Sequence, residues 1–340
     1  MKSVAPFEFE SLLQQSTRWI DVRAPIEFQS GSIPGAINLP LLMDVERHEI
    51  GLAYKSQGQK AAIDLGHQLV SGPIREARVT AWLAEAKQHP NAVFYCFRGG
   101  LRSQIVQLWL KEKNVHPSIV EGGYKALRRY LMEKLDSVAQ DLKFHVVSGP
   151  TGSGKTTYLQ SSARPYLDLE ALAKHRGSAF GSLSEPQPNQ VDFENALAIA
   201  LLRLYACKEA ILIEDESLMI GHRLIPAALF RRMQTSRKII LDTPTEVRIE
   251  NIFRDYVLNS NLGLRGDVGR FTEFRASVHA ISRKLGGLRT QEILRDLDIS
   301  QKEFESNNSL DSNRVWIRKL LAWYYDPSYK FSLQKNEGLF

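Results

Sequence analysis

The sequence contains few cysteines and no long apolar segment. Its two cysteines, Cys96 and Cys207, form no CxxC pair and no cluster with metal-ligand spacing, so neither a disulfide scaffold nor a zinc site is indicated. The longest apolar run, 196–206, is interrupted by Arg203 and is too short to cross a bilayer. Acidic residues lie near the start, where a signal peptide needs a continuous apolar stretch. We therefore expect a cytoplasmic protein without a membrane partner.

The composition is that of a soluble globular protein with a modest excess of positive charge. Of its 340 residues, 43% are hydrophobic and 24% are charged, which argues against extended disorder. This length favours two domains of ordinary size, each with its own core. The net charge of +6 is compatible with a polyanionic partner, and equally with an enzyme that acts on small anions.

Both halves of the chain alternate short apolar runs with helical stretches. Runs such as 144–147 and 211–213 are largely apolar, as are the buried strands of parallel sheets. Strands that alternate with helices predict an α/β fold in each half. A polar stretch separates the halves, so we expect a first domain over 1–135, a linker over 136–143 and a second domain over 144–340.

Cys96 ends one apolar run and opens a loop that leads into a predicted helix. Two glycines in this loop allow backbone N–H groups to turn inward, and the start of the helix adds partial positive charge. With two arginines, these groups would stabilise an anion and the thiolate form of Cys96, the predicted catalytic residue. A buried structural cysteine is the alternative, but it leaves the glycines and arginines unexplained. The predicted anion loop comprises Phe97, Arg98, Gly99, Gly100, Leu101 and Arg102.

The first half resembles the rhodanese family. The resemblance rests on Asp21-Val22-Arg23, on the stretch GSIPGAINLP at 31–40 and on the glycine motif Glu121-Gly122-Gly123-Tyr124. It implies a rhodanese-like domain in which Cys96 is the position that holds a chalcogen or a phosphoryl-type group. It also implies that Asp21 and Arg23 brace the fold and take no part in the reaction.

Two features depart from the rhodanese pattern. Arg102 lies six residues after Cys96, a C-x5-R spacing that is similar to that of cell-cycle phosphatases with the same fold. We therefore expect the loop to accept a tetrahedral, phosphate-like anion rather than bare sulfur. The second feature is an insert at about 41–80, which we expect to be helical. His67 in this insert is a candidate site residue, although a lone histidine is more often structural.

The second half begins with a complete GxxxxGK[ST] motif. It follows the strand predicted at 144–147 and precedes a helical run, which is the context of a phosphate-binding P-loop. Its N–H groups and Lys155 would hold a di- or triphosphate, and Thr156 would bind Mg²⁺. The predicted phosphate-binding residues are Gly149, Thr151, Gly152, Ser153, Gly154, Lys155 and Thr156.

The sequence does not decide which acidic residue acts with the P-loop, or which phosphate compound binds there. The strand over 211–213 delivers Glu214 and Asp215, and either can be the Walker-B-like acid; polar residues that merely end a strand are the alternative. Because a P-loop binds the phosphates and contacts the attached group only weakly, ATP, GTP and a prenyl diphosphate all remain candidate ligands.

Taken together, the two halves resemble the tRNA 2-selenouridine synthases. The resemblance covers essentially the whole chain, and its motifs include the stretches 96–103, 54–60, 193–195, 214–217 and 324–327. It implies an enzyme that geranylates a wobble 2-thiouridine with geranyl diphosphate and then replaces the geranylthio group by selenium from selenophosphate. These two compounds are substrates, so the resemblance implies no permanently bound cofactor. It implies tRNA carrying 2-thiouridine as a partner, together with an enzyme that supplies selenophosphate.

The tRNA-binding surface is predicted from charge. Basic residues between 265 and 289 outnumber acidic ones, and such a patch would make salt-dependent contacts with phosphates. A solvated helix face is the alternative. The aromatic and basic C-terminal part is expected to be helical, and packing against the domain is the preferred interpretation over base stacking. The predicted tRNA contacts are Arg265, Arg270, Arg275, Arg283, Lys284 and Arg289.

Three other functions compete with this interpretation. The C-x5-R loop alone suits a phosphatase or a plain sulfurtransferase fused to a nucleotide-hydrolysing module. A non-catalytic P-loop switch is a second alternative, but the presence of the thiol at Cys96 counts against it. A small-molecule kinase is the third, with Arg248 and Arg254 lining a lid; salt bridges on a helix surface would explain these two arginines equally well.

Overall fold

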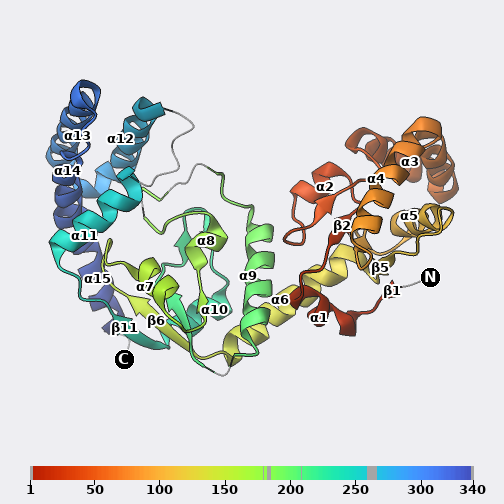
Figure 1. Cartoon of the computed structure of the whole chain (residues 1–340), viewed down its shortest axis with the longest axis horizontal. Helices are drawn as coiled ribbons and strands as arrows, with labels where there is room; N and C mark the ends of the chain where they lie inside the picture. The colour runs from red at the N-terminus through yellow and green to blue at the C-terminus, as the bar shows by residue number, and fades with distance from the viewer. Residues whose placement is uncertain (1–2, 179, 182–184, 208, 259–265, 338–340) are drawn as a thin grey trace. The chain divides into compact units, whose positions relative to one another are not determined.

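The chain divides into two compact units. In the computed structural model (Figure 1), the first unit comprises Met1–Asp141 and Asn189–Ala206, and the second comprises Leu142–Pro188 and Cys207–Phe340. The structure describes residues 3–178, 180–181, 185–207, 209–258 and 266–337. Each unit has its own parallel sheet, so the expected α/β class is confirmed for both.

The first unit contains a five-stranded sheet in which each pair of neighbouring strands is parallel. Its central strands are short and apolar, and Ile20 and Phe94 are completely buried between the layers of helix. Continuous burial explains why these strands lack the alternation of polar and apolar residues. In spatial order the strands are β1 (Ser3–Val4), β5 (Ser118–Val120), β4 (Val93–Tyr95), β2 (Trp19–Asp21) and β3 (Ile37–Asn38).

The insert of this unit is helical, as predicted. Helix α3 (Asp44–Leu69) bends at Gly58, whose φ of +85° lies outside the helical range, and α4 (Gly72–Gln88) follows it. Trp82 of α4 is fully buried against Trp109 of α5 (Leu101–Lys111), the helix that begins at the cysteine loop. The smaller elements are η1 (Pro6–Glu8), α1 (Phe9–Gln14) and α2 (Pro25–Gln29).

The expected linker at 136–143 is not an extended connection in the structure. Most of it continues α6 (Gly123–Asp141), because Val138 and Ala139 extend the buried face of that helix. A second difference concerns α9 (Gln190–Leu204), which follows the P-loop in sequence but packs on α6 and α1 in the first unit. Asn195 of α9 is buried there and donates a hydrogen bond to the carbonyl of Ser32 (2.7 Å).

The second unit contains a four-stranded parallel sheet with the P-loop at the end of its central strand β6. Neighbouring β6 and β8 are buried almost throughout, in agreement with the apolar runs in the sequence. The spatial order is β11 (Arg237–Ile240), β6 (Phe144–Ser148), β8 (Ile211–Glu214) and β7 (Tyr166–Leu167). The nearby elements are α7 (Lys155–Ser161), α8 (Leu169–Ala173), β9 (Met219–Ile220), β10 (Arg223–Leu224), α10 (Ala227–Gln234), α11 (Thr245–Ile252) and η2 (Phe253–Leu258).

The C-terminal part is helical and has an aromatic core of its own. Phe271, Phe274 and Trp316 are buried in one cluster, with the rings of Phe274 and Trp316 5.2 Å apart. Of the aromatic residues between 315 and 331, Trp316 is buried in this cluster and Trp323, Tyr324 and Tyr325 pack against it, in agreement with the preferred interpretation, whereas Phe331 is 70% exposed. Its elements are α12 (Gly266–Leu285), α13 (Gly287–Asn307), α14 (Asn313–Leu320), η4 (Leu321–Tyr325) and α15 (Asp326–Glu337).

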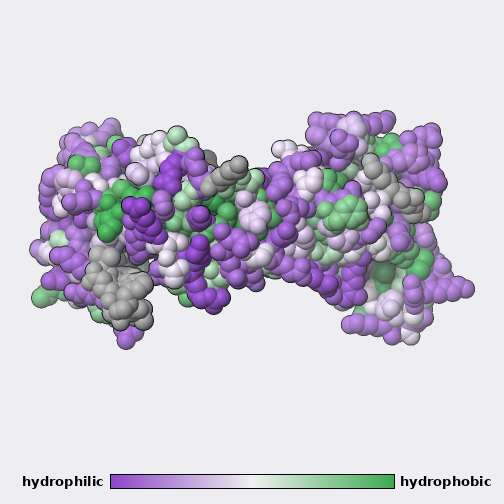
Figure 2. Space-filling view, turned by 90° about the horizontal axis from the view of Figure 1, so that it is seen from below, coloured by the Kyte–Doolittle hydropathy of each residue, from purple (hydrophilic) through white to green (hydrophobic). Residues whose placement is uncertain are grey.

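The surface is mainly hydrophilic on the face shown in Figure 2, where hydrophobic residues form separate, smaller groups. Among the described residues, none of the helices has both the length and the apolar composition needed to cross a membrane.

Candidate active sites

Cys96 lies at the end of β4, where the chain turns toward α5. Its Sγ is 3.2 Å from the hydroxyl of Ser103 in the first turn of that helix. Within the described residues, the N–H groups of 97–102 donate no hydrogen bond to another protein group. Cys96 itself is only 3% exposed, so the loop encloses nearly all of its side chain.

The glycine motif after β5 closes this loop from behind. The N–H of Tyr124 donates to the carbonyl of Cys96 (2.8 Å), and the N–H of Lys125 donates to that of Phe97 (3.0 Å). Gly123 has a φ of +60°, and a Cβ at this position would collide with the carbonyl oxygen of Cys96. Only glycine fits both the backbone angle and the close approach, so the motif fixes the position of Cys96.

The two arginines of the loop have different surroundings, contrary to the expectation that both add full charge. Arg102 forms a bidentate ion pair with Glu27, with N–O distances of 2.6 and 3.1 Å. Burial raises the pKa of Glu27, but hydrogen bonds and charge from Arg102 leave that pKa below its ordinary value. Much of the charge of Arg102 is therefore neutralised by a carboxylate. Arg98 is exposed and, among the described residues, has no carboxylate partner.

Asp21 and Arg23 form a buried ion pair within the first unit. Their closest atoms are 2.6 Å apart, and both side chains are at most 2% exposed. Arg23 also donates to the carbonyl of Gly31 (2.7 Å) and lies over the ring of Tyr124, 3.9 Å from its centroid. The pair therefore ties two rhodanese-like motifs together, in agreement with a bracing role.

The P-loop connects β6 to α7 and is supported from behind by α11. Asn251 donates to the carbonyl of Gly152 (2.9 Å), and Arg248 donates to that of Thr151 (2.9 Å). Arg248 is also paired with Asp326 at 2.5 Å. Arg248 therefore lies behind the P-loop. The kinase alternative had placed it in a lid over the ligand, and the structure does not show it there.

Glu214 and Asp215 point to different partners. The hydroxyl of Thr156 donates to Glu214 (2.6 Å), which is fully buried at the end of β8. Asp215 instead accepts hydrogen bonds from Ser148 (2.6 Å) and Lys238 (3.1 Å). Of the two candidates, Glu214 is therefore the one that contacts the P-loop threonine.

Two further carboxylates, Glu170 and Glu216, join Glu214 beside the P-loop. Carboxylate oxygens of the three residues lie within 4.8 Å of one another. Burial, followed by the charge of Glu170, raises the pKa of Glu216 to about 8 and places that of Glu214 well above its ordinary value. Oε2 of Glu214 is buried and has no hydrogen-bond partner among the described residues. A divalent cation would satisfy this oxygen and reduce the repulsion, so the donor set fits one.

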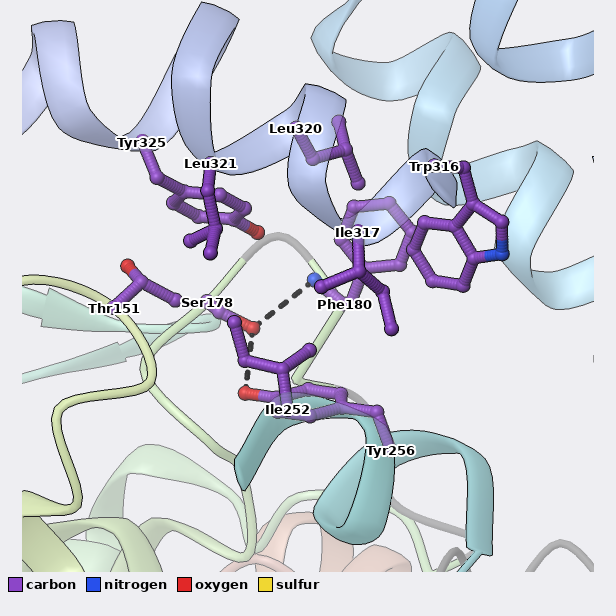
Figure 3. Close-up of a pocket in the computed structure, with 10 residues that line it drawn as sticks. All are labelled: Thr151, Ser178, Phe180, Ile252, Tyr256, Trp316, Ile317, Leu320, Leu321 and Tyr325. Atoms are coloured by element: carbon purple, nitrogen blue, oxygen red, sulfur yellow. Dashed lines mark hydrogen bonds between the residues drawn. The ribbon is translucent and has the colours of Figure 1, made fainter. Parts of the chain in front are cut away.

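A small apolar pocket, with a volume of about 20 Å³, adjoins the P-loop (Figure 3). Thr151, Ser178, Ile252 and Tyr256 line it and also line the polar cavity that contains Lys155, so the two spaces are contiguous. The hydroxyls of Ser178 and Tyr256 bond to one another (2.9 Å), which leaves mainly carbon facing the space. Its far wall consists of Phe180, Trp316, Ile317, Leu320, Leu321 and Tyr325.

The predicted tRNA contacts do not form one uniform patch. Arg265 lies outside the described residues, and Arg270 is largely covered. Arg275 pairs with Asp298 at 2.7 Å, so it has a structural partner. Arg283 and Lys284 are exposed at the end of α12. Arg289, also exposed, lies over the ring of Trp323, 5.6 Å from its centroid.

Comparison with known proteins finds a match for each half of the chain. A family model described as "tRNA 2-selenouridine synthase AAA domain" matches residues 142–340, and a rhodanese-like domain model matches residues 6–129. A tRNA 2-selenouridine synthase of Bdellovibrio bacteriovorus is 47% identical over 99% of this chain and 94% of its own length. Those of Nitrosomonas europaea and Cupriavidus necator are 43% and 45% identical, each over 97% of this chain and 92% of its own length.

Proposed function

The chain belongs to the tRNA 2-selenouridine synthase family, and from this premise we propose that it exchanges the sulfur of a wobble 2-thiouridine in tRNA for selenium in two steps. The first step, geranylation, takes place at the P-loop. The second step, selenation, takes place at the cysteine loop. Direct exchange would require an unmodified thiocarbonyl sulfur to leave, whereas an alkylated sulfur departs as a thiolate.

In the geranylation step, the sulfur of 2-thiouridine attacks C1 of geranyl diphosphate. A sulfur–carbon bond forms, the carbon–oxygen bond to diphosphate breaks, and the base releases its N3 proton. Lys155 and the loop N–H groups neutralise the departing diphosphate. The observation that supports this choice of ligand is the apolar lining of the pocket next to the polar cavity of the P-loop; its volume of about 20 Å³ means that a prenyl chain must displace the lining side chains to enter. Its carbon walls suit a hydrocarbon chain better than the ribose of a nucleotide.

We further propose that a divalent cation such as Mg²⁺ binds at this site. Thr156 and Glu214 would hold it, with Glu170 and Glu216 contributing negative charge close by. The ion would supply further charge neutralisation for the diphosphate. Without it, the buried side chains of Glu214 and Glu216 and the half-buried side chain of Glu170 would share one space with an anionic ligand.

In the selenation step, selenophosphate binds the N–H groups of the cysteine loop, with Cys96 at its base. Selenium forms a bond to C2 of the base, the C2–sulfur bond breaks and geranylthiol leaves. Water then cleaves the selenium–phosphorus bond, which releases phosphate and 2-selenouridine. The exposed charge of Arg98 favours entry of the anion, while the pair of Arg102 and Glu27 holds the start of α5 in place.

Single substitutions separate the two steps. Cys96→Ser should accumulate S-geranylated tRNA and form no 2-selenouridine, whereas Lys155→Ala should form 2-selenouridine only from tRNA geranylated beforehand. Nucleoside mass analysis after incubation with geranyl diphosphate and selenophosphate measures both products. Cys207→Ser, which alters the other cysteine, is the matched control and should behave as the wild type. Loss of geranylation in Cys96→Ser would overturn the assignment, and turnover of an aryl phosphate without any 2-selenouridine would favour the phosphatase alternative.

A further inference from the structure

The helical insert of the first unit forms the wall of an apolar cavity. This cavity lies between α3 and α5 and has a volume of about 280 Å³. Leu42, Ile50 and Ile63 line it from the insert, and Ile105 and Trp109 line it from α5. Because these side chains offer mainly carbon to the space, the cavity suits an apolar ligand and provides few groups for a charged one.

The cavity is open and begins at the cysteine loop. Leu101 and Arg102 belong both to the loop and to the cavity lining. Leu101 is 45% exposed and Tyr54, also in the lining, is 58% exposed, so the space communicates with solvent. The guanidinium of Arg102 is held by Glu27, which leaves the apolar wall free of an unpaired charge at this point. A chain that extends from a ligand in the loop past Leu101 would therefore enter an apolar space.

We propose that this cavity binds the hydrocarbon chain of the S-geranylated uridine during selenation, an inference that rests on the proposed function. To bring C2 of that base to the cysteine loop, the enzyme must also bring a ten-carbon chain attached through one sulfur atom. Burial of such a chain is favourable in proportion to its area. An apolar cavity of roughly 150 Å³ is large enough for benzene, so the larger space here can accept the longer chain.

This site is distinct from the apolar pocket at the P-loop. That pocket would bind the prenyl chain while it is still attached to diphosphate, and it is built from residues of the second unit alone. The cavity of the insert is built from residues of the first unit alone. The insert is also the part of this unit that departs from the rhodanese pattern. Binding of a prenyl chain in the cavity would explain why the insert is present.

The test compares tRNAs that carry S-methyl- or S-geranyl-2-thiouridine, with selenophosphate and the full-length enzyme. The wild type should convert the geranylated tRNA with a higher kcat/KM. Tyr54→Ala and Ile105→Gln should lower kcat/KM for the geranylated tRNA about tenfold, the factor that corresponds to loss of burial of roughly two methylene groups. Neither should change the value for the methylated tRNA. Leu108→Gln is the matched control, since Leu108 is exposed on the same helix and does not line the cavity.

Binding of the S-geranyl and S-methyl nucleosides, measured by calorimetry, separates this inference from the proposed function. If no S-alkyl tRNA is selenated, yet Tyr54→Ala weakens binding of the geranyl nucleoside and not of the methyl one, the cavity assignment stands and the proposed reaction is wrong. If selenation occurs but is equally efficient with both chains, or falls equally for both in the variants, the cavity assignment is wrong. Because Tyr54 is exposed, its replacement tests the site even if Ile105→Gln fails to fold.

Discussion

Glu170, Glu214 and Glu216 show how single residues give the P-loop site its chemistry. The sequence pointed to Glu214 and Asp215 together because they follow an apolar strand, and in the structure the hydrogen bond from Thr156 goes to Glu214. Glu170 was missed because it precedes β8 by a long segment and matches no motif. Only the fold brings its carboxylate next to the others.

The raised pKa of Glu216 predicts a pH-dependent stability of the metal-free protein. The unfolded chain releases this proton near the ordinary pKa of 4.5, whereas the folded protein keeps it until about pH 8. Between these values the folded state binds more protons, so its stability falls as pH rises. Urea unfolding of the second unit from pH 5 to 8 should show this decline, and Glu216→Gln should reduce its slope by up to about 1.4 kcal/mol per pH unit.

Two controls complete that measurement. Glu209→Gln removes an exposed carboxylate of the same unit and should leave the slope unchanged. Added Mg²⁺ should stabilise the wild type most at the upper end of the pH range. Equal slopes for the wild type and Glu216→Gln would contradict the assigned shift.

At the scale of elements, the cysteine loop depends on the glycine motif that begins α6. Gly123 and Gly35 both have positive φ values, +60° and +76°, but their surroundings differ. A Cβ at Gly123 would collide with the carbonyl of Cys96, whereas nothing lies within 4 Å of one at Gly35. Replacing Gly35 should therefore cause backbone strain alone, whereas replacing Gly123 should also displace the cysteine loop.

Gly123→Ala should lower the selenation rate about 100-fold, because a shift of about 1 Å at a reacting group has an effect of this size. Geranylation should be unaffected, since we propose that it takes place in the other unit. Gly35→Ala should cost about 1 kcal/mol of stability through strain without changing either rate. Both rates are measured on the same tRNA by nucleoside mass analysis, and a Gly123→Ala enzyme with normal selenation would show that the loop tolerates the shift.

Arg283 and Lys284, at the end of α12, are exposed members of the predicted basic patch, as is Arg289 over the ring of Trp323. Arg283→Glu with Lys284→Glu should weaken tRNA binding and reduce the slope of log affinity against log salt by about 1 to 2, if each residue contacts a phosphate. Arg275→Gln should alter stability more than binding, because Arg275 is paired with Asp298. Filter binding over a range of salt concentrations measures the slope, and an unchanged slope in the double variant would exclude this surface.

At the scale of the whole molecule, local patterns predicted the strands and loops but not every long-range grouping. The strands before Cys96 and before the P-loop were found from their apolar runs, since buried parallel strands have a strong local signal. Helix α9 was assigned to the second domain because of its place in the sequence. Its buried face and Asn195 instead complete the first unit. The pairing of Arg102 with Glu27 also depends on contacts that no local pattern contains.

The central claim is that the two steps belong to different units, and a sequential transfer of tRNA between variants tests it most directly. Thiolated tRNA is first incubated with Cys96→Ser enzyme and geranyl diphosphate, then purified, and then incubated with Lys155→Ala enzyme and selenophosphate. Our account predicts 2-selenouridine in this order and none when the two enzymes are used in the reverse order. Absence of 2-selenouridine in the first order, with both variants folded and the geranylated intermediate present, would contradict it.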